Sequence, residues 1–319
     1  MNPSLHTVLG AAGSIGQATI QALQTRGFAI RAVSRSTALP NVSNHKADLL
    51  DLAQARAAVK DSSHVYVCVG LPYKTEIWNR DWEILMQNVI TACSEQNARI
   101  IFLDNIYMYG PSPLQVPIEE SHPQQPTSIK GKARKRTTDL LLAAISEGKV
   151  KGVIGRAADI YGPKAVNSSL YISVLERMLA GKAPQLLAAA DIPHRYSSTR
   201  DIGNALVELA LAEDTYGQAW HLPVGRLTTN AEMISLLNRE LETDFKASVL
   251  PNFMRKILRL FIPPLKEIEE MLYQVQHPYD FSDAKFRTRF PDFQVSTYEA
   301  GIKEMVASFK ENPELKSNL

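Results

Sequence analysis

Short apolar runs alternate with amphipathic stretches through the first half of the chain, which predicts alternating strands and helices. The predicted strands cover residues 7–9, 29–34, 64–69, 99–103 and 152–155. The predicted helices cover residues 14–26, 50–59, 82–96 and 130–146, where apolar positions recur at helical spacing. Apolar strands that alternate with helices are typical of parallel strands buried on both faces. The pattern therefore predicts an α/β fold, a doubly wound parallel sheet of the Rossmann type.

The alternation stops after Pro163, and the remaining sequence is rich in predicted helix and in proline. Helices are predicted at residues 170–179 and 202–212, and a strand at residues 219–223. We therefore expect two domains. A Rossmann domain over residues 1–165 with a return segment at 195–225 is joined to a smaller C-terminal helical substrate lobe, residues 166–194 and 226–319.

Residues 253–262 form a basic amphipathic stretch within the expected substrate lobe. Its apolar side chains fall on one helical face, namely Phe253, Met254, Ile257, Leu258 and Phe261. A membrane-surface helix is one interpretation of such a pattern. We favour a lid or wall of the substrate pocket, or plain core, because Pro263 and Pro264 end the stretch inside this lobe.

Composition and charge give no indication of unusual partners. The 319 residues are 45% hydrophobic and 21% charged, with a net charge of +2, as in ordinary globular proteins. This net charge does not indicate binding to nucleic acid or to a membrane surface. No signal peptide or membrane-spanning run is visible in the sequence. Cys68 and Cys93 lie in apolar segments, and no Cys/His spacing indicates a metal site. We expect a cytoplasmic protein with reduced, buried cysteines.

Three glycines follow the first predicted strand and open the first predicted helix. Gly10 suits a tight turn, Gly13 leaves room for phosphate groups, and Gly16 allows close packing of helix on strand. The helix that follows, with Ser14 and Ile15 in its first turn, presents free N–H groups to an anion. The sequence therefore predicts a pyrophosphate-binding loop for a dinucleotide.

Further segments along the chain add to this loop. They are residues 27–35, residues 47–49, Tyr107 to Gly110, Arg156 to Pro163, and Arg200 to Ile202 followed by a helix rich in Ala and Leu. Together they resemble the extended short-chain dehydrogenase/reductase superfamily, of the NAD(P)-dependent epimerase/dehydratase type, over about residues 5–225. The resemblance implies a nicotinamide dinucleotide cofactor, with Asp48, Leu49 and Val69 among its contacts. It also implies a small-molecule substrate, and a homodimer is possible because relatives often dimerise.

The end of the second predicted strand bears on the choice between NAD and NADP. An acidic residue there would accept hydrogen bonds from the NAD ribose and repel a 2′-phosphate. This chain has Ser34, Arg35 and Ser36 instead, and an arginine can hold a phosphate with two parallel hydrogen bonds. We therefore expect NADP.

The chain departs from the family where the catalytic Tyr-x-x-x-Lys pair would stand. Alignment places Lys130 at the tyrosine and Arg134 at the lysine, and Asn105 falls at the serine position. In one interpretation Lys130 is the proton donor, Arg134 binds the nicotinamide ribose and Asn105 binds the substrate carbonyl. In a second, Tyr73 or Tyr107 donates the proton. In a third, the protein carries or senses NADP(H) without redox chemistry.

We expect an NADP-dependent oxidoreductase acting on a small carbonyl or hydroxyl substrate. The alternative is a non-catalytic NADP(H)-binding protein. A sugar-nucleotide epimerase or dehydratase is less favoured, because the resemblance makes those reactions depend on the missing tyrosine. Arg195 is expected to face a phosphate or carboxylate of the substrate, or else to form a surface ion pair.

Overall fold

The computed structural model describes residues 4–258 and 263–316, and the chain divides into two compact units. The first comprises Met1–Met108, Lys130–Ala157 and Arg200–Leu222, and the second comprises Tyr109–Ile129, Ala158–Thr199 and Pro223–Leu319. The segment Arg200–Leu222 thus rejoins the first unit after Ala158–Thr199, which belongs to the second unit. After β6 (Gly152–Arg156), the strand β7 (Asp159–Tyr161) pairs with β10 (Tyr196–Ser198) and not with the large sheet.

The first unit is built on a seven-stranded sheet in the order β11-β6-β5-β4-β1-β2-β3, with every pair parallel. Besides β6, its strands are β1 (Leu5–Leu9), β2 (Ala29–Ser34), β3 (Ser43–Lys46), β4 (His64–Val67), β5 (Arg99–Asp104) and β11 (Ala219–His221). The predicted doubly wound Rossmann sheet is confirmed. The strand missed by the sequence analysis, β3, has the sequence SNHK and no buried residue, because it closes the exposed edge of the sheet.

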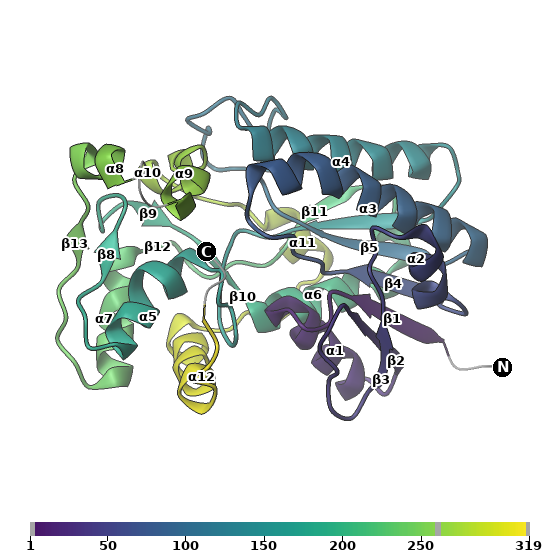
Figure 1. The fold of residues 1–319 in the computed structure, drawn as a ribbon, viewed down its shortest axis with the longest axis horizontal. Coiled ribbons are helices and arrows are strands. Elements are labelled where there is room, and N and C mark those ends of the chain that lie inside the picture. Colours follow the sequence, from purple (N-terminus) through teal and green to yellow (C-terminus); the bar gives the residue numbers. More distant parts are fainter. Residues whose placement is uncertain (1–3, 259–262, 317–319) are drawn as a thin grey trace. The chain divides into compact units, whose positions relative to one another are not determined.

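Helices cover both faces of this sheet. They are α1 (Ser14–Thr25), α2 (Leu52–Val59), α3 (Thr75–Gln96), α4 (Ile129–Ser146) and α6 (Thr199–Leu211). Figure 1 shows α3 and α4 on one side of the sheet and α1 and α6 on the other. Helix α3 begins seven residues before the predicted start at Trp82. The prediction missed these first two turns because they carry few apolar residues other than Trp78. This extension brings further side chains to the carboxyl edge of the sheet.

The second unit combines short strands with helices. Its strand pairs are β7 with β10, β9 (Pro193–His194) with β12 (Thr228–Thr229), and β8 (Gln185–Leu186) with β13 (Ser248–Val249). Its helices are α5 (Glu176–Leu179), which continues a π-helical turn at Tyr171–Leu175, and α7 (Asn230–Leu241), α8 (Asn252–Leu258), α9 (Pro263–Glu269), α10 (Tyr273–Gln276), α11 (Ala284–Arg289) and α12 (Tyr298–Glu311). Helices α7 and α12 pack together around a core that includes Met233, Leu237, Ile302 and Met305.

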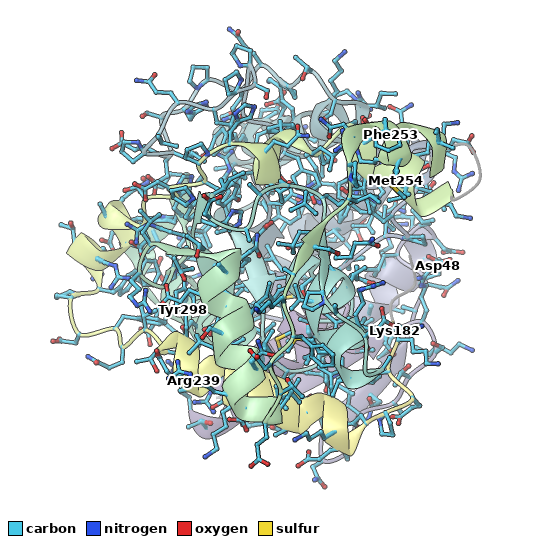
Figure 2. The ribbon with its side chains drawn as sticks, turned by 90° about the vertical axis from the view of Figure 1, so that its left-hand side faces the viewer. Asp48, Lys182, Arg239, Phe253, Met254 and Tyr298 are labelled. Atoms are coloured by element: carbon cyan, nitrogen blue, oxygen red, sulfur yellow. The ribbon has the colours of Figure 1, made fainter. Side chains whose placement is uncertain are left out.

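The amphipathic stretch expected at residues 253–262 is helical over α8. Phe253, Met254 and Ile257 are 66%, 41% and 54% exposed, so for these three the expected burial in a core is wrong. Figure 2 labels Phe253 and Met254 on this helix. A lid or wall of the substrate pocket stays a prediction. Residues 259–262, with Phe261, lie outside the described part of the chain. Among the described residues, no helix has the length and apolar character needed to span a bilayer.

Candidate functional site

The glycine loop lies at the carboxyl end of β1, between β1 and α1. Gly10 has a φ of +78°, and a Cβ atom there would lie 2.6 Å from the Cys68 carbonyl oxygen. A Cβ atom at Gly16 would lie 2.3 Å from the Gly10 carbonyl oxygen. Both positions therefore require glycine for the fold itself. The same packing sets the main chain of Val69 against the loop, since its Cα would lie 2.8 Å from a Cβ atom at Gly10.

Gly13 has a different environment. It is exposed and has an ordinary φ of −71°, and a Cβ atom there would meet only the Gly10 carbonyl oxygen, at 3.4 Å. It occupies the N-cap of α1, where no side chain caps the helix and no acidic residue lies in the first turn. Ser14 and Ile15 are the first two residues of that turn, and Ile15 is buried. A free helix N-terminus beside an open glycine fits the pyrophosphate of a dinucleotide.

The residues expected around the adenosine end lie at the carboxyl ends of β2 and β3. Arg35 and Ser36 are exposed, whereas the Ser34 hydroxyl bonds the main chain of Thr37 and organises the turn. The Asp48 carboxylate accepts a hydrogen bond from the Leu50 N–H at 3.1 Å.

Beside Asp48, Leu49 is buried, and the Asp48 N–H donates to the side chain of Gln54. Asp48 therefore shapes the turn before α2, and Arg35 is the exposed cation of this group.

Lys130 lies at the start of α4 and is fully buried. Its Nζ donates to the Thr75 hydroxyl at 2.8 Å and lies 4.6 Å from the centroid of the Tyr73 ring. The Tyr73 hydroxyl in turn donates to the Tyr107 hydroxyl across 3.4 Å. The structure therefore gathers Lys130, Tyr73 and Tyr107, predicted as alternative proton donors, into one cluster with Thr75.

Two neighbours fix the tyrosines of this cluster. Trp78 stacks on Tyr107 with ring centroids 5.7 Å apart and meets Tyr73 edge-on at 5.4 Å. The Asn105 side-chain oxygen accepts a hydrogen bond from the Tyr107 N–H at 3.0 Å. Asn105 thus orients the loop that carries Tyr107, a contact other than the substrate contact expected from alignment.

Arg134 lies one helical turn after Lys130 and points into the core. Its side chain is 3% exposed, and its Nε donates to the Asp104 carboxylate at 2.9 Å. Its guanidinium lies 4.1 Å from the Trp82 ring centroid. Thr138 also donates to Asp104. This geometry favours a structural contact with Asp104 over the ribose contact that the resemblance implies.

A model of the NAD dependent epimerase/dehydratase family matches residues 6–215, which is more than half of the chain. The chain belongs to the NAD dependent epimerase/dehydratase family. A curated relative, dTDP-6-deoxy-L-talose 4-dehydrogenase (NAD(P)(+)) of Kitasatospora kifunensis, is 26% identical over 149 residues. That match covers 45% of this chain and 46% of the relative, so the chain spans about half the length of the relative it matches.

Solved structures of low sequence identity share the fold along nearly all of the chain. UDP-glucose 4-epimerase of Thermotoga maritima, solved with UDP-glucose, has a TM-score of 0.79 at 17% identity and covers 97% of this chain and 99% of its own. The dTDP-glucose 4,6-dehydratase of Bacillus anthracis, solved with NAD, has a TM-score of 0.78 at 16% identity and covers 98% of both chains. The fold shared with these structures thus extends past the end of the family-model match.

Two residues of the candidate site were missed by sequence reasoning. Thr75 and Trp78 lie in the first turns of α3, which were not predicted to be helical. Thr75 is separated from Lys130 by 55 positions, so no local pattern links the two. In the sequence, the spacing of the aromatic residues Tyr73 and Trp78 was the one signal that could have indicated this part of the site.

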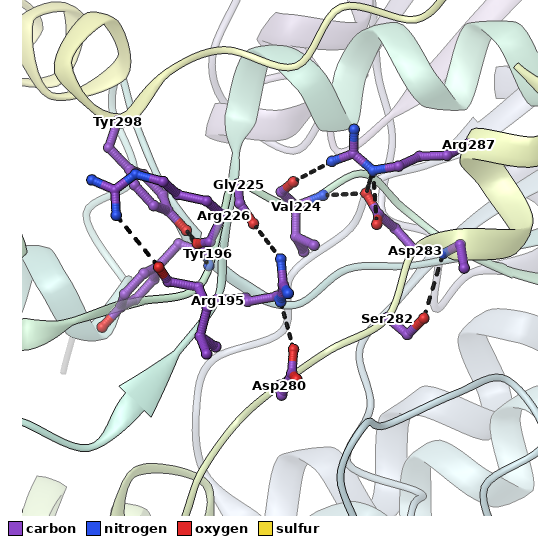
Figure 3. Close-up of polar contacts among 12 residues, drawn as sticks. Arg195, Tyr196, Val224, Gly225, Arg226, Asp280, Ser282, Asp283, Arg287 and Tyr298 are labelled. Atoms are coloured by element: carbon purple, nitrogen blue, oxygen red, sulfur yellow. Dashed lines mark hydrogen bonds and ion pairs between the residues drawn. The ribbon is translucent and has the colours of Figure 1, made fainter. Parts of the chain in front are cut away.

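Arg195 lies in the second unit, between β9 and β10. Its Nε donates to Asp280 at 2.6 Å and its Nη1 donates to the Gly225 carbonyl at 3.0 Å (Figure 3). The ion pair weighed as the alternative to a substrate contact is therefore present. Its side chain is 26% exposed and lines a cavity with other arginines.

Proposed function

We propose that this chain binds NADP(H) and catalyses reduction or oxidation at a carbonyl or hydroxyl carbon of a small-molecule substrate. The observation that carries the proposal is the cluster of Lys130, Tyr73 and Tyr107. All three follow the carboxyl ends of β4 and β5 or open α4, which is the edge of the sheet where the glycine loop lies. Ligands of open α/β sheets bind at this edge.

The cluster offers a route for the proton that such a reaction needs. Tyr73 donates its phenolic proton to the substrate oxygen as the carbonyl is reduced. The Tyr73 phenolate then regains a proton from solvent through the Tyr107 hydroxyl, which lies 3.4 Å away. The Lys130 ammonium, held by Thr75, stabilises the phenolate that forms. When bound, NADPH supplies the hydride that adds to the carbonyl carbon.

The choice of NADP rests on Arg35 and Ser36. Both are exposed after β2, where the guanidinium is available to the 2′-phosphate. Gly13 and the first turn of α1, with Ser14 and Ile15, hold the pyrophosphate. Asp48, Leu49 and Val69 complete the cofactor contacts in this proposal.

A second candidate function is sugar-nucleotide epimerisation or dehydration. It is supported by the relatives, since the curated relative acts on a dTDP-sugar and the solved neighbours include a UDP-glucose epimerase and a dTDP-glucose dehydratase. In either case Arg195 is proposed to contact an anionic group of the substrate.

The test is NADPH oxidation by the full chain over a panel of carbonyl compounds that includes 4-keto sugar nucleotides. Tyr73→Phe and Lys130→Met are expected to lower kcat by about 10²-fold or more, with NADPH binding unchanged. Lys135→Met is the matched control, because Lys135 lies on the same helix in a surface pair with Asp139. Wild-type levels of turnover in Tyr73→Phe and Lys130→Met would contradict the proposed chemistry. NADPH binding without turnover of any compound would favour a non-catalytic NADP(H)-binding protein.

A further inference from the structure

Helix α8 carries an exposed apolar face, made of Phe253, Met254 and Ile257. The spacing of these three residues places them on one side of the helix. Ten large apolar side chains are exposed in the described part of the chain, and four of them lie within residues 249–257, the fourth being Val249. Phe253 is the most exposed of the ten. Single exposed apolar residues need no partner, whereas a cluster of them marks an interaction surface.

The other side of α8 is charged and buried, which reverses the usual arrangement of a surface helix. Arg255 is 6% exposed, and its Nε lies 3.4 Å from a carboxylate oxygen of Glu269 on α9. Nε and Nη1 of Arg255 have no hydrogen-bond partner among the described residues. A surface helix ordinarily buries its apolar side and exposes its charges. Because α8 holds a cation inside and a phenyl ring in water, a nonpolar phase against the exposed apolar face would stabilise it.

The segment around α8 is strongly basic. Between Asp244 and Glu267 the sequence has no acidic residue. It has five basic residues there, Lys246, Arg255, Lys256, Arg259 and Lys266. The whole chain has a net charge of only +2, so this segment is a local concentration of positive charge. Lys246 and Lys266 are exposed. Cations beside exposed apolar side chains match the surface of a bilayer that contains anionic lipid.

A protein partner fits the exposed apolar face less well than a bilayer does. A stable protein–protein interface takes about 20–30 residues from each side, whereas this face offers three. A second copy of the chain, related by a two-fold axis at α8, would bring the two basic segments together, and they would repel each other. A bilayer accepts single apolar side chains at its surface and needs no matching shape.

We propose that α8 docks this protein on the surface of an anionic lipid bilayer. Phe253, Met254 and Ile257 enter the boundary between headgroups and acyl chains, and the neighbouring lysines contact the lipid phosphates. Three apolar side chains bind weakly by themselves, so the docking is reversible and depends on anionic lipid. It does not depend on the redox chemistry proposed above.

The experiment is co-sedimentation of the full chain with vesicles at low ionic strength. Vesicles of phosphatidylcholine alone are compared with vesicles that also contain phosphatidylserine. We expect partition into the phosphatidylserine vesicles to be at least about tenfold stronger and to weaken as salt is added.

Matched substitutions locate the contact on the protein. Ile257→Ser is expected to lower partition at least about fivefold, because an apolar side chain no longer enters the bilayer. Its melting temperature should equal that of the wild type, since Ile257 is exposed. Ile84→Ser changes an isoleucine that is 45% exposed on α3 in the first unit, and it is expected to leave partition unchanged.

Phe253→Trp reports insertion directly. The three native tryptophans, Trp78, Trp82 and Trp220, are buried, so brominated lipid is expected to quench the introduced indole and leave the wild-type fluorescence unchanged.

Three outcomes would overturn the proposal. The first is the absence of binding to phosphatidylserine vesicles, and the second is equal partition of Ile257→Ser and wild type. The third is binding that leaves the introduced indole unquenched, which would indicate charge attraction without docking of α8. Dimerisation without lipid that Ile257→Ser abolishes would assign the face to a second copy of the chain instead.

Discussion

Arg134 and Asp104 form an ion pair that joins α4 to the carboxyl end of β5 in the core of the first unit. The two side chains are 3% and 0% exposed, and Nε and Oδ1 lie 2.9 Å apart. Replacing Arg134 by Met leaves the Asp104 carboxylate buried without this partner. We expect the free energy of unfolding to fall by about 3–5 kcal/mol, measured by denaturant titration.

Arg136→Met is the matched control for this pair. Arg136 lies on the same helix and pairs with Glu83 at the surface, so its loss is expected to cost under about 1 kcal/mol. A binding measurement separates the two roles of Arg134. If folded Arg134→Met protein binds NADPH much more weakly than wild type, Arg134 contacts the cofactor, and the structural assignment is wrong.

Gly10 and Gly13 are expected to respond differently to the same substitution. Gly10→Val combines a φ of +78° with a Cβ atom 2.6 Å from a carbonyl oxygen, so it is expected to prevent folding or destabilise it severely. Gly13→Val has neither a positive φ nor a clash with a carbonyl oxygen, so its melting temperature is expected to equal that of the wild type. The valine side chain would occupy the space through which the phosphate groups reach the main chain of the loop. We therefore expect the Kd for NADPH to rise at least about tenfold. Unchanged NADPH binding in Gly13→Val would place the cofactor elsewhere.

Arg35→Glu is expected to reverse the cofactor preference. An acidic residue after β2 repels the 2′-phosphate of NADPH and can accept hydrogen bonds from the ribose of NADH. The ratio of the two Kd values, measured by fluorescence titration, is expected to shift toward NADH by about 10²-fold or more. Lys60→Glu makes the same charge change at the C-cap of α2, away from the site, and serves as control. A wild-type protein that binds NADH more tightly than NADPH would contradict the assignment of NADP.

Two stacked histidines in the sheet predict loss of stability in acid. Burial and the neighbouring His64 lower the pKa of His6 to about 3, and burial and Arg99 lower the pKa of His64 to about 4. Their rings lie 4.5 Å apart. Both bind protons more readily in the unfolded chain, so their stabilisation is complete above about pH 6.5 and is lost as pH falls toward 4 and 3.

Denaturant unfolding at about pH 7.5 and pH 5 measures this effect. Each histidine is expected to contribute a loss on the order of 2 kcal/mol between these conditions. His6→Leu removes one titrating ring, so its free energy of unfolding should depend less steeply on pH. If the free energy of unfolding of His6→Leu depended on pH as steeply as that of the wild type, other groups would be the cause of the acid sensitivity.

Local sequence patterns were sufficient to predict most of the helices and strands of the first unit. The predicted strand at residues 29–34 matches β2, and the helix predicted at residues 14–26 matches α1 to within one residue, because apolar periodicity and glycine breaks mark both. The polar strand β3 and the early start of α3 lack such periodicity. They form because the sheet edge and the neighbouring helices supply their partners.

The sequence by itself determined the glycine loop, the parallel sheet and the departure at Lys130 and Arg134, since each depends on residues close together in the chain. Only the tertiary structure joined Lys130 to Thr75 and Tyr73, buried Arg134 against Asp104, and brought Arg195 beside Arg287. These contacts link segments tens of residues apart. No periodic pattern encodes them, because they depend on how whole strands and helices pack and on which buried charges must find partners.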